Sequence, residues 1–335
     1  MKKFNFWFLV YPDIPKPIGG VKQMHRAAEA ISKLGHNAVI VQDNKSFHPG
    51  WFSSSVSTIA KNEWFSSHIP SPKVDIIVIA ETFVPICLKI FPGVPKIIFN
   101  QNGSYTFGLS HEKPYDVNVI SDIYNNPDVI HIWCVSDYDR RLLVSGLMVP
   151  SSKVSTLINS SDLLSVSTRT RKRKQVAFMP RKNSHDATVV TALLSRQPWF
   201  SDWNIQPIVN LKHSSVISTL QDSLIFLSFG HPEGFGLPVL EAMISGCFVV
   251  GYSGLGGRDL FSYKSQFPLM TEVSVGDWQG FLDSVFNIVC NFDKDSDELL
   301  YQLGLLSDSA QSSHSFEAFE RSLFASIQSL QSLQS

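Results

Sequence analysis

The stretch GHPEGFGLPVLEAMISGC, from Gly230 to Cys247, places two glutamates eight positions apart around a Gly-Phe-Gly-Leu-Pro turn. It follows an apolar run, Leu224–Phe229, which we expect to be a buried strand. Pro238 suits the first turn of a following helix, and Gly246 suits its end. The stretch therefore predicts a strand, a tight turn and a helix that begins close to both carboxylates.

The turn before Pro238 has the features of an anion site. The first N–H groups of a helix lack partners within the helix, and the helix dipole places positive charge there. Gly234 and Gly236 carry no side chain, so a phosphate can approach the backbone closely. Carboxylates accept hydrogen bonds from sugar hydroxyls, so Glu233 and Glu241 would suit a nucleotide sugar. The alternative is that Glu233 only complements the dipole and that Glu241 is a solvated helix residue.

Strand and helix patterns alternate in two series along the 335 residues. The apolar runs are nearly continuous, as in parallel strands that are covered on both faces. The expected strands are Phe4–Val10, His36–Val41, Val74–Ala80, Lys96–Phe99, Val129–Val135 and Val154–Ile158, then Val176–Met179, Ile205–Val209, Leu224–Phe229 and Phe248–Gly251. A helix is expected from about Val21 to Gly35, and the pattern is helical after Gly276, including a segment near Phe316–Leu333.

We therefore expect an α/β protein with two Rossmann-like, doubly wound domains that face each other across a cleft. The first domain would span residues 1–165 and the second residues 176–312. The polar, basic segment 166–175 between them is interpreted as a linker, although a basic run of this kind also suits a membrane or nucleic-acid patch. A net charge of −1 gives no overall attraction to nucleic acid or to an anionic membrane, which favours the linker.

The ends and the cysteines of the chain indicate its compartment. The N-terminal apolar run ends at Tyr11 without a small-residue cleavage site, so we expect a buried strand rather than a signal peptide. No stretch reaches the roughly 20 apolar residues of a membrane span. Cys134 and Cys247 lie in strand-like runs, as expected of buried, reduced thiols. We expect a cytoplasmic protein with possible peripheral contact at the inner face of a membrane.

Four segments together resemble a known family. Pro232–Val250 closely resembles the E-x7-E signature of retaining glycosyltransferases of family four, which have the two-domain GT-B fold. Pro15–Val41 resembles their glycine loop, first helix and Gly-His turn. Lys153–Asp162 resembles the segment that closes their N-terminal domain, and Tyr252–Phe261 resembles the loop after the signature helix. The resemblance covers nearly the whole chain.

The resemblance implies roles for single residues. Glu241 would bind the ribose hydroxyls of the donor, and Glu233 would bind hydroxyls of the transferred sugar. Other donor contacts would come from the turn after Glu233, through its backbone, and from the N-terminal glycine loop. These positions are Phe235, Gly236, Leu237, Gly19 and Gly20. The first domain would take the acceptor and the second the donor, and residues 313–335 would form a helix that returns to the first domain.

The chain departs from the family pattern at two places. Basic residues after the first strand of the second domain neutralise the leaving diphosphate in the family, and here Arg181 and Lys182 stand there. They are adjacent rather than several residues apart, so we expect Arg181 to face the ligand. Family members often carry a histidine after the fourth N-terminal strand, where Gln101 or Asn102 would take over a donor-sugar contact. His131, in the next strand, is expected to be a core histidine.

The resemblance implies transfer of a hexosyl group, with retention of configuration, from a nucleoside-diphosphate sugar to a hydroxyl of a glycan or lipid-linked glycan, as in polysaccharide biosynthesis. Arg181, Lys182 and Glu233 are the expected catalytic residues. With no DxD-type loop, no metal or other cofactor is expected. Two alternatives remain open: a nucleotide-sugar epimerase, for which the sequence offers no recognisable acid/base pair, and a non-catalytic nucleotide-sugar-binding subunit, which the absent histidine favours.

Overall fold

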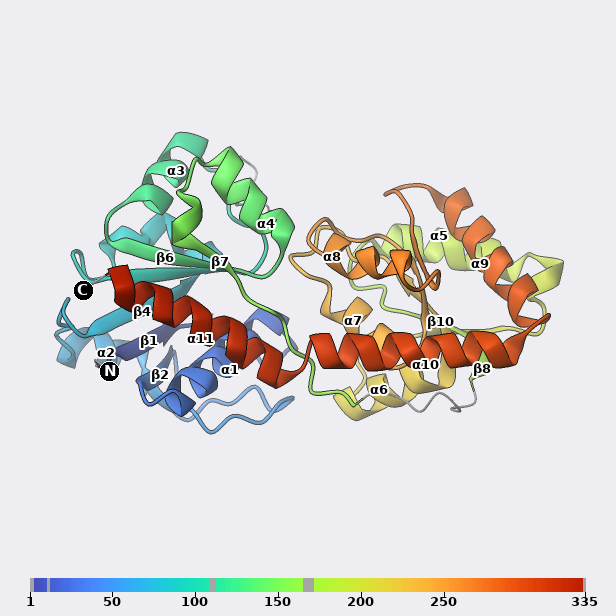
Figure 1. Ribbon diagram of the computed structural model, residues 1–335, viewed down its shortest axis with the longest axis horizontal. Helices are drawn as coiled ribbons and strands as arrows, with labels where there is room; N and C mark the ends of the chain where they lie inside the picture. Colours follow the sequence, from blue (N-terminus) through green and yellow to red (C-terminus); the bar gives the residue numbers. More distant parts are fainter. Residues whose placement is uncertain (1–2, 11–12, 109–112, 165–171, 334–335) are drawn as a thin grey trace. The chain divides into compact units, whose positions relative to one another are not determined.

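The computed structural model describes residues 3–10, 13–108, 113–164 and 172–333. The chain forms two compact units, each built around a parallel β-sheet (Figure 1). The N-terminal unit comprises Met1–Asn159 and Phe319–Ser335, and the C-terminal unit comprises Ser160–Ala318. The chain thus leaves the N-terminal unit once and returns to it through its last helix.

The N-terminal unit has a seven-stranded sheet in the order β3-β2-β1-β4-β5-β6-β7, and its paired strands are parallel. Every residue of the neighbouring strands β4 and β5 is buried, as expected of a sheet that is covered on both faces. The strands are β1 (Asn5–Leu9), β2 (Asn37–Gln42), β3 (Ser57–Ala60), β4 (Asp75–Ala80), β5 (Lys96–Asn100), β6 (Val129–Cys134) and β7 (Val154–Thr156).

Helix α1 (Gly19–Lys33) buries one apolar stripe, including Met24, Ala27, Ala28 and Ile31, as its helical spacing predicts. Gly35 follows the helix in the left-handed conformation, with φ of 86°, which glycine adopts without steric cost. The other helical segments that belong to this unit wholly or in part are α2 (Lys61–Ser67), η1 (Glu81–Lys89), α3 (Val117–Asn125), α4 (Asp137–Arg141), η2 (Leu142–Gly146), η3 (Ser151–Lys153) and α11 (Phe316–Leu333).

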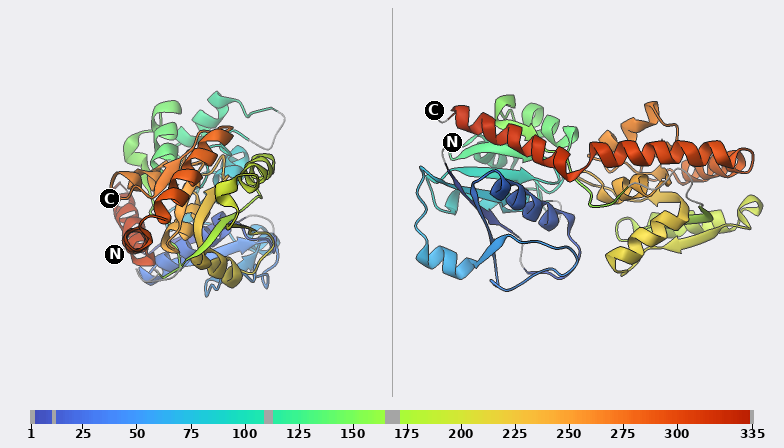
Figure 2. Two further views of the ribbon diagram at one scale, coloured as in Figure 1. Left: turned by 90° about the vertical axis from the view of Figure 1, so that its right-hand side faces the viewer. Right: turned by 60° about the horizontal axis from the view of Figure 1, so that its bottom comes forward.

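The last helix, α11, packs on the N-terminal unit, as the resemblance implies (Figure 2). The indole N–H of Trp133, on β6, donates to Ser326 Oγ at 2.9 Å. The N–H of Ile158 donates to Ser322 Oγ at 3.1 Å. Both contacts join α11 to the end of the sheet nearest β7, so the final helix is part of the N-terminal unit.

The C-terminal unit has a five-stranded parallel sheet in the order β12-β11-β10-β8-β9. Its strands are β8 (Arg173–Phe178), β9 (Asn204–Pro207), β10 (Ser223–Ser228), β11 (Phe248–Gly251) and β12 (Met270–Glu272). Its helical segments are α5 (Ser184–Ser195), η4 (Pro198–Phe200), α6 (His213–Asp222), α7 (Leu237–Ile244), α8 (Arg258–Phe261), η5 (Ser262–Ser265), α9 (Trp278–Phe292) and α10 (Ser296–Ser313). The doubly wound α/β arrangement that the sequence predicts is confirmed in both units.

The structure adds details that the sequence pattern did not predict. Strands β3 and β12 were not expected, because they are short edge strands with exposed or half-buried polar residues. The expected linker at 166–175 lies mostly outside the described residues, and its last three residues, 173–175, form the start of β8. They follow Lys172, which is buried while its ammonium donates to the carbonyl oxygens of Leu220 and Ser245.

Candidate functional site

The turn between β10 and α7 forms the centre of the site in the C-terminal unit. Gly236 is the N-cap of α7 and has a φ of 91°, in the left-handed region that favours glycine. Pro238 lies in the first turn of the helix, as predicted, and no side chain of the described residues caps this helix end. The positive end of the α7 dipole therefore lies at Gly236 and Leu237, which is where a diphosphate would be stabilised.

A second glycine-rich loop holds Glu233 at the start of this turn. The Glu233 N–H donates to the carbonyl oxygen of Gly254 at 2.7 Å, and the Gly256 N–H donates to the carbonyl oxygen of Glu233 at 3.1 Å. A Cβ atom on Gly256 would lie 1.7 Å from the carbonyl oxygen of Gly234. The close approach of the two loops thus requires glycine at position 256, and it fixes the backbone that carries Glu233.

Lys182 is paired with the Glu233 carboxylate. Its ammonium lies 3.0 Å from Glu233 Oε1 and donates to the carbonyl oxygen of Pro232 at 2.6 Å. Both side chains keep about a fifth of their surface exposed, at 24% for Lys182 and 22% for Glu233. A cation and an anion are therefore adjacent and accessible at the end of β10.

The loop between β8 and α5 places Lys182 in this position. Asn183 adopts the left-handed conformation, with φ of 49°, and its amide donates to the carbonyl oxygens of Phe229 and His231 at 2.8 and 2.9 Å. These two bonds tie the loop to the end of β10. Arg181, on the same loop, is exposed, and its role remains a prediction.

Glu241 lies one turn into α7, and its carboxylate has a histidine as its neighbour. His213, the first residue of α6, has its Nε2 atom 3.6 Å from Glu241 Oε1. The Glu241 side chain is 19% exposed, so its carboxylate remains accessible. The ring of Phe235 is buried and lies 5.3 Å from the ring of His314, so only the backbone of Phe235 remains for a ligand.

The sequence interpretation missed several polar groups around the turn. His231 is close to Lys182, Arg258 and Glu233; burial lowers the pKa of His231, and the two cations lower it further. Arg258, at the start of α8, has its Nε atom 3.7 Å from Glu272 Oε1. His231 lies two positions before Glu233 in the stretch from Gly230 to Cys247, so its sequence position could have indicated that it lies at the site. Only the fold brings Arg258 and His213 to these positions.

In the N-terminal unit, the predicted glycine loop and Gln101 are in contact. Gly19 and Gly20 are the first two residues of α1, and Gln101 follows β5. The Gln101 amide donates to the carbonyl oxygen of Gly20 at 3.0 Å. Asn102 is buried, and its side-chain oxygen accepts the N–H of Ser104 at 3.0 Å, which stabilises the turn that follows. The structure thus places Gln101 on the glycine turn and Asn102 within its own loop.

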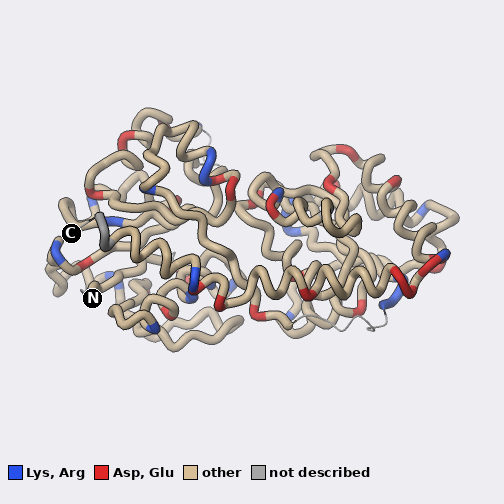
Figure 3. The backbone as a smooth tube through the Cα atoms, in the orientation of Figure 1, with Lys and Arg blue, Asp and Glu red and all other residues tan. Residues whose placement is uncertain are grey.

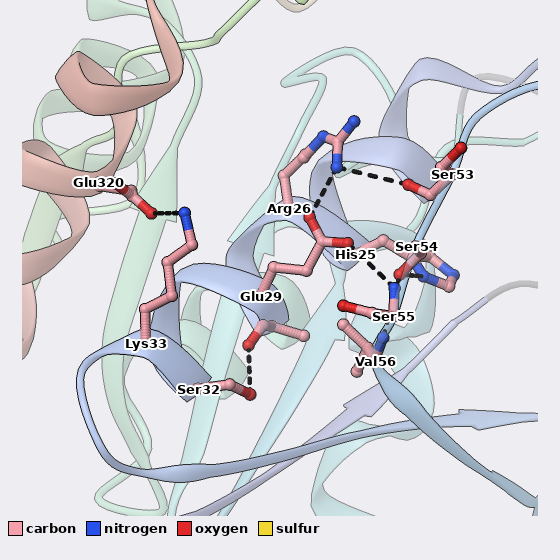
Figure 4. Close-up of polar contacts among 11 residues, drawn as sticks. His25, Arg26, Glu29, Ser32, Lys33, Ser53, Ser54, Ser55, Val56 and Glu320 are labelled. Carbon is pink, nitrogen blue, oxygen red and sulfur yellow. Dashed lines mark hydrogen bonds and ion pairs between the residues drawn. The ribbon is translucent and has the colours of Figure 1, made fainter.

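Two histidines of this unit are buried and each is hydrogen-bonded to a serine. His131 is buried and its Nε2 atom lies 2.8 Å from Ser155 Oγ; burial lowers its pKa to about 4, as suits the predicted core histidine. His25, on α1, is also buried, and its Nδ1 atom lies 2.9 Å from Ser54 Oγ. Arg26 and Glu29 bind the same segment through Ser53 and Ser55 (Figure 4). The segment after β2 is therefore fastened along α1.

Charged groups of both signs are interspersed in each unit (Figure 3). Among the described residues, no group of three or more His, Cys, Asp or Glu side chains is arranged to hold a metal ion. No helix in the described part of the chain is long and apolar enough to cross a membrane.

Comparisons with known proteins agree with the two-sheet fold. The chain is 27% identical over 259 residues to an alpha-1,6-glucosyltransferase of Actinobacillus pleuropneumoniae serotype 7, which covers 75% of this chain and 71% of the relative. The fold of this chain matches that of the sucrose-phosphate synthase of Thermosynechococcus elongatus with a TM-score of 0.71, over 99% of this chain and 100% of that one, at 13% identity. The chain has the GT-B fold.

A further solved structure has the same fold. The pneumococcal O-GlcNAc transferase GtfA, solved in complex with UDP and GlcNAc, has a TM-score of 0.67 over 98% of this chain and 99% of that one, at 9% identity. No model of a known protein family matches the chain. The likeness to glycosyltransferases therefore lies in the tertiary fold and in the sequence similarity to the glucosyltransferase named above.

Proposed function

We propose that this protein is a glycosyltransferase, which transfers a hexosyl group, with retention of configuration, from a nucleoside-diphosphate sugar to a hydroxyl of a glycan or lipid-linked glycan. The observation that carries the proposal is the pair of Glu233 and Lys182, 3.0 Å apart and accessible, at the turn before α7. An anion that accepts sugar hydroxyls and a cation that attracts phosphate are thereby placed next to a helix N-terminus.

The donor would lie along this turn. Its diphosphate would accept hydrogen bonds from the backbone at Gly236 and Leu237, and Glu241 would accept bonds from the ribose hydroxyls. Glu233 would bind hydroxyls of the hexosyl group. Hydrogen bonds to a charged group contribute about 1.5–3 kcal/mol each, so two carboxylates account for a substantial part of donor affinity.

Charge develops on the leaving diphosphate as the bond from the anomeric carbon to the phosphate oxygen breaks. Lys182, Arg181 and the N-terminus of α7 would stabilise this charge before and during the transfer. The acceptor oxygen forms the new bond to the anomeric carbon on the same face, and its proton passes to the leaving phosphate oxygen. This route requires no nucleophilic side chain.

The donor is proposed to be UDP-glucose. The sequence relative is named as a glucosyltransferase, and the structure of GtfA contains UDP. The name of the relative also describes a 1,6 linkage, which supports a sugar hydroxyl as the acceptor.

A panel assay tests this function. The purified protein is incubated with UDP-glucose, UDP-galactose, UDP-GlcNAc and GDP-mannose, with and without glucan and lipid-linked glycan acceptors, and released nucleoside diphosphate is measured. We expect acceptor-dependent release of UDP from UDP-glucose, and NMR of the product should show the α anomer. Interconversion of the sugars without release would indicate an epimerase, and donor binding without either reaction would indicate a binding subunit.

A further inference from the structure

Two buried carboxyl groups hold the loop that carries Gln101. The Gln101 N–H donates to Glu81 Oε2 at 2.9 Å, and the Gly103 N–H donates to Asp139 Oδ1 at 2.9 Å. Glu81 is 2% exposed and Asp139 is fully buried. Neither carboxyl group lies near the surface, so both act on the backbone of the loop.

The sheet topology explains this arrangement. Strand β5 lies between β4 and β6, and all three are parallel. Glu81 directly follows β4, Gln101 directly follows β5, and Asp139 lies on α4 just after β6. The carboxyl ends of parallel strands meet at one edge of the sheet, so the loop after β5 is hydrogen-bonded from both sides.

The side chain of Gln101 connects its loop to the glycine turn at the N-terminus of α1. Its amide donates to the carbonyl oxygen of Gly20, and a Cβ atom on Gly20 would lie 2.0 Å from Gln101 Oε1. Gln101 thus occupies the space that a side chain at position 20 would need. The chain of contacts runs from Glu81 through Gln101 to the first turn of α1.

The surroundings of Glu81 determine its protonation. Burial, with a smaller contribution from the nearby Asp139, raises its pKa to about 8, although the backbone N–H groups of Gln101 and Asn102 act in the opposite direction. Tyr124 on α3 and Cys134 on β6 also face this cluster, and burial raises the pKa of each. Arg140, on α4, is the cation that acts on Cys134. Glu81 is therefore a neutral acid at pH 7, and Asp139 lies beside it.

We propose that Glu81 is a positioning residue, which holds the Gln101 loop by accepting its backbone N–H and through that loop sets the glycine turn at the N-terminus of α1. This inference rests on the proposed function, because the turn and Gln101 are its expected donor contacts. Ionisation of Glu81 would add a second charge beside the buried Asp139, which is unfavourable in a buried site. The loop should therefore lose order above about pH 8.

Hydrogen exchange tests the structural step without any substrate. Glu81→Ala should speed amide exchange across residues 96–108 by about tenfold or more at pH 7, whereas Glu81→Gln, which keeps an acceptor oxygen, should exchange like the wild type. Asp75→Ala is the matched control. Asp75 is a buried acceptor at the other end of β4, bonded to Trp7 Nε1 at 2.8 Å. The proposal is overturned if Glu81→Ala leaves this segment unchanged or if Asp75→Ala affects it equally.

The pH dependence of unfolding tests the protonation. A carboxyl with a raised pKa keeps its proton in the folded state while the unfolded chain ionises, so its stabilising effect is lost as pH rises from about 4.5 to about 8. The wild type should lose stability relative to Glu81→Gln over this range in urea titrations. Parallel curves would overturn the neutral-acid form of the proposal.

Kinetics with UDP-glucose test the link to turnover. Glu81→Ala should lower kcat about tenfold or more and change KM less, because the turn is misplaced rather than removed. Glu81→Gln should restore kcat at pH 7 and abolish the decline of the wild type above about pH 8. Equal losses in both variants would overturn the proposal. If the wild type releases no UDP, the proposed function fails, while hydrogen exchange and unfolding still decide the role of Glu81.

Discussion

The turn before α7 and the first turn of α1 resemble each other in their glycines but are held by different contacts. Each is a glycine-containing turn at the N-terminus of a helix in a parallel α/β unit. At α7 the carboxylates are accessible and paired with Lys182 and His213. At α1 the carboxyl groups of Glu81 and Asp139 are buried and bind backbone N–H groups of the neighbouring loop. Accessible carboxylates can bind a ligand, whereas buried ones determine backbone position.

The largest expected effect comes from removing the basic residues beside the turn before α7. Arg181→Ala combined with Lys182→Ala should lower kcat by about 100- to 1,000-fold, because charge on the leaving diphosphate loses its stabilisation. UDP release under single-turnover conditions measures it. Lys174→Ala is the control, since Lys174 forms exposed pairs with Asp202 and Asp293 on the same unit. A double variant with full turnover would remove these residues from the mechanism.

Glu241→Ala should weaken donor binding by about 10- to 100-fold, the loss of hydrogen bonds to one carboxylate. Calorimetric titration with UDP-glucose measures the effect, and Glu298→Ala, an exposed glutamate on α10, serves as the control. Unchanged affinity in Glu241→Ala would show that this carboxylate is only a solvated helix residue.

Ser326→Ala tests the attachment of α11 to the N-terminal unit. It leaves the buried N–H of Trp133 without its acceptor, so the free energy of unfolding should fall by about 1–3 kcal/mol. An exposed ion pair also joins α11 to α1, with Lys33 Nζ 2.7 Å from Glu320 Oε1. Glu320→Gln should lower the free energy of unfolding by only about 0–1 kcal/mol. Chemical denaturation compares the two, and an equal loss would contradict the role assigned to burial.

The smallest effect concerns pH in the buried region. Burial lowers the pKa of His131 to about 4, so the folded state stays neutral while the unfolded chain binds a proton below about pH 6.5. Stability is therefore lost as pH falls from about 6.5 to about 4. Relative to His131→Gln, the wild type should lose about 1 kcal/mol between pH 7 and pH 5.5. Equal pH slopes would show that His131 carries no such linkage.

The sequence predicts most of the fold because each central strand contains a run of apolar residues. Leu224–Phe229 corresponds to β10, whose residues are all buried, and the segment near Phe316–Leu333 corresponds to α11. It does not predict β3 or β12, because an edge strand owes its structure to pairing with a neighbour rather than to its own hydrophobicity. The start of β8 was likewise hidden by charged residues, since Arg173 and Lys174 open the strand and form ion pairs with aspartates.

For the site, the sequence predicts the positions that lie within one local motif. Glu233, Gly236, Pro238 and Glu241 are close along the chain, and a turn followed by a helix fixes their arrangement. It does not predict which distant residues meet them. The pairing of Lys182 with Glu233 and the contact of His213 with Glu241 arise because parallel strands bring their carboxyl ends to one edge.

The sequence by itself determined the α/β fold class, the two series of strands and helices, and the start of the helix that carries Glu241. Hydrophobic periodicity and the conformational preferences of glycine and proline act over a few residues, so they can be read without the tertiary structure. Only the tertiary structure decided that Lys182 lies against Glu233 and that Glu81 holds the Gln101 loop. These contacts join loops from different strands, so their geometry and the raised pKa of Glu81 come from the packing of the sheet and the exclusion of water.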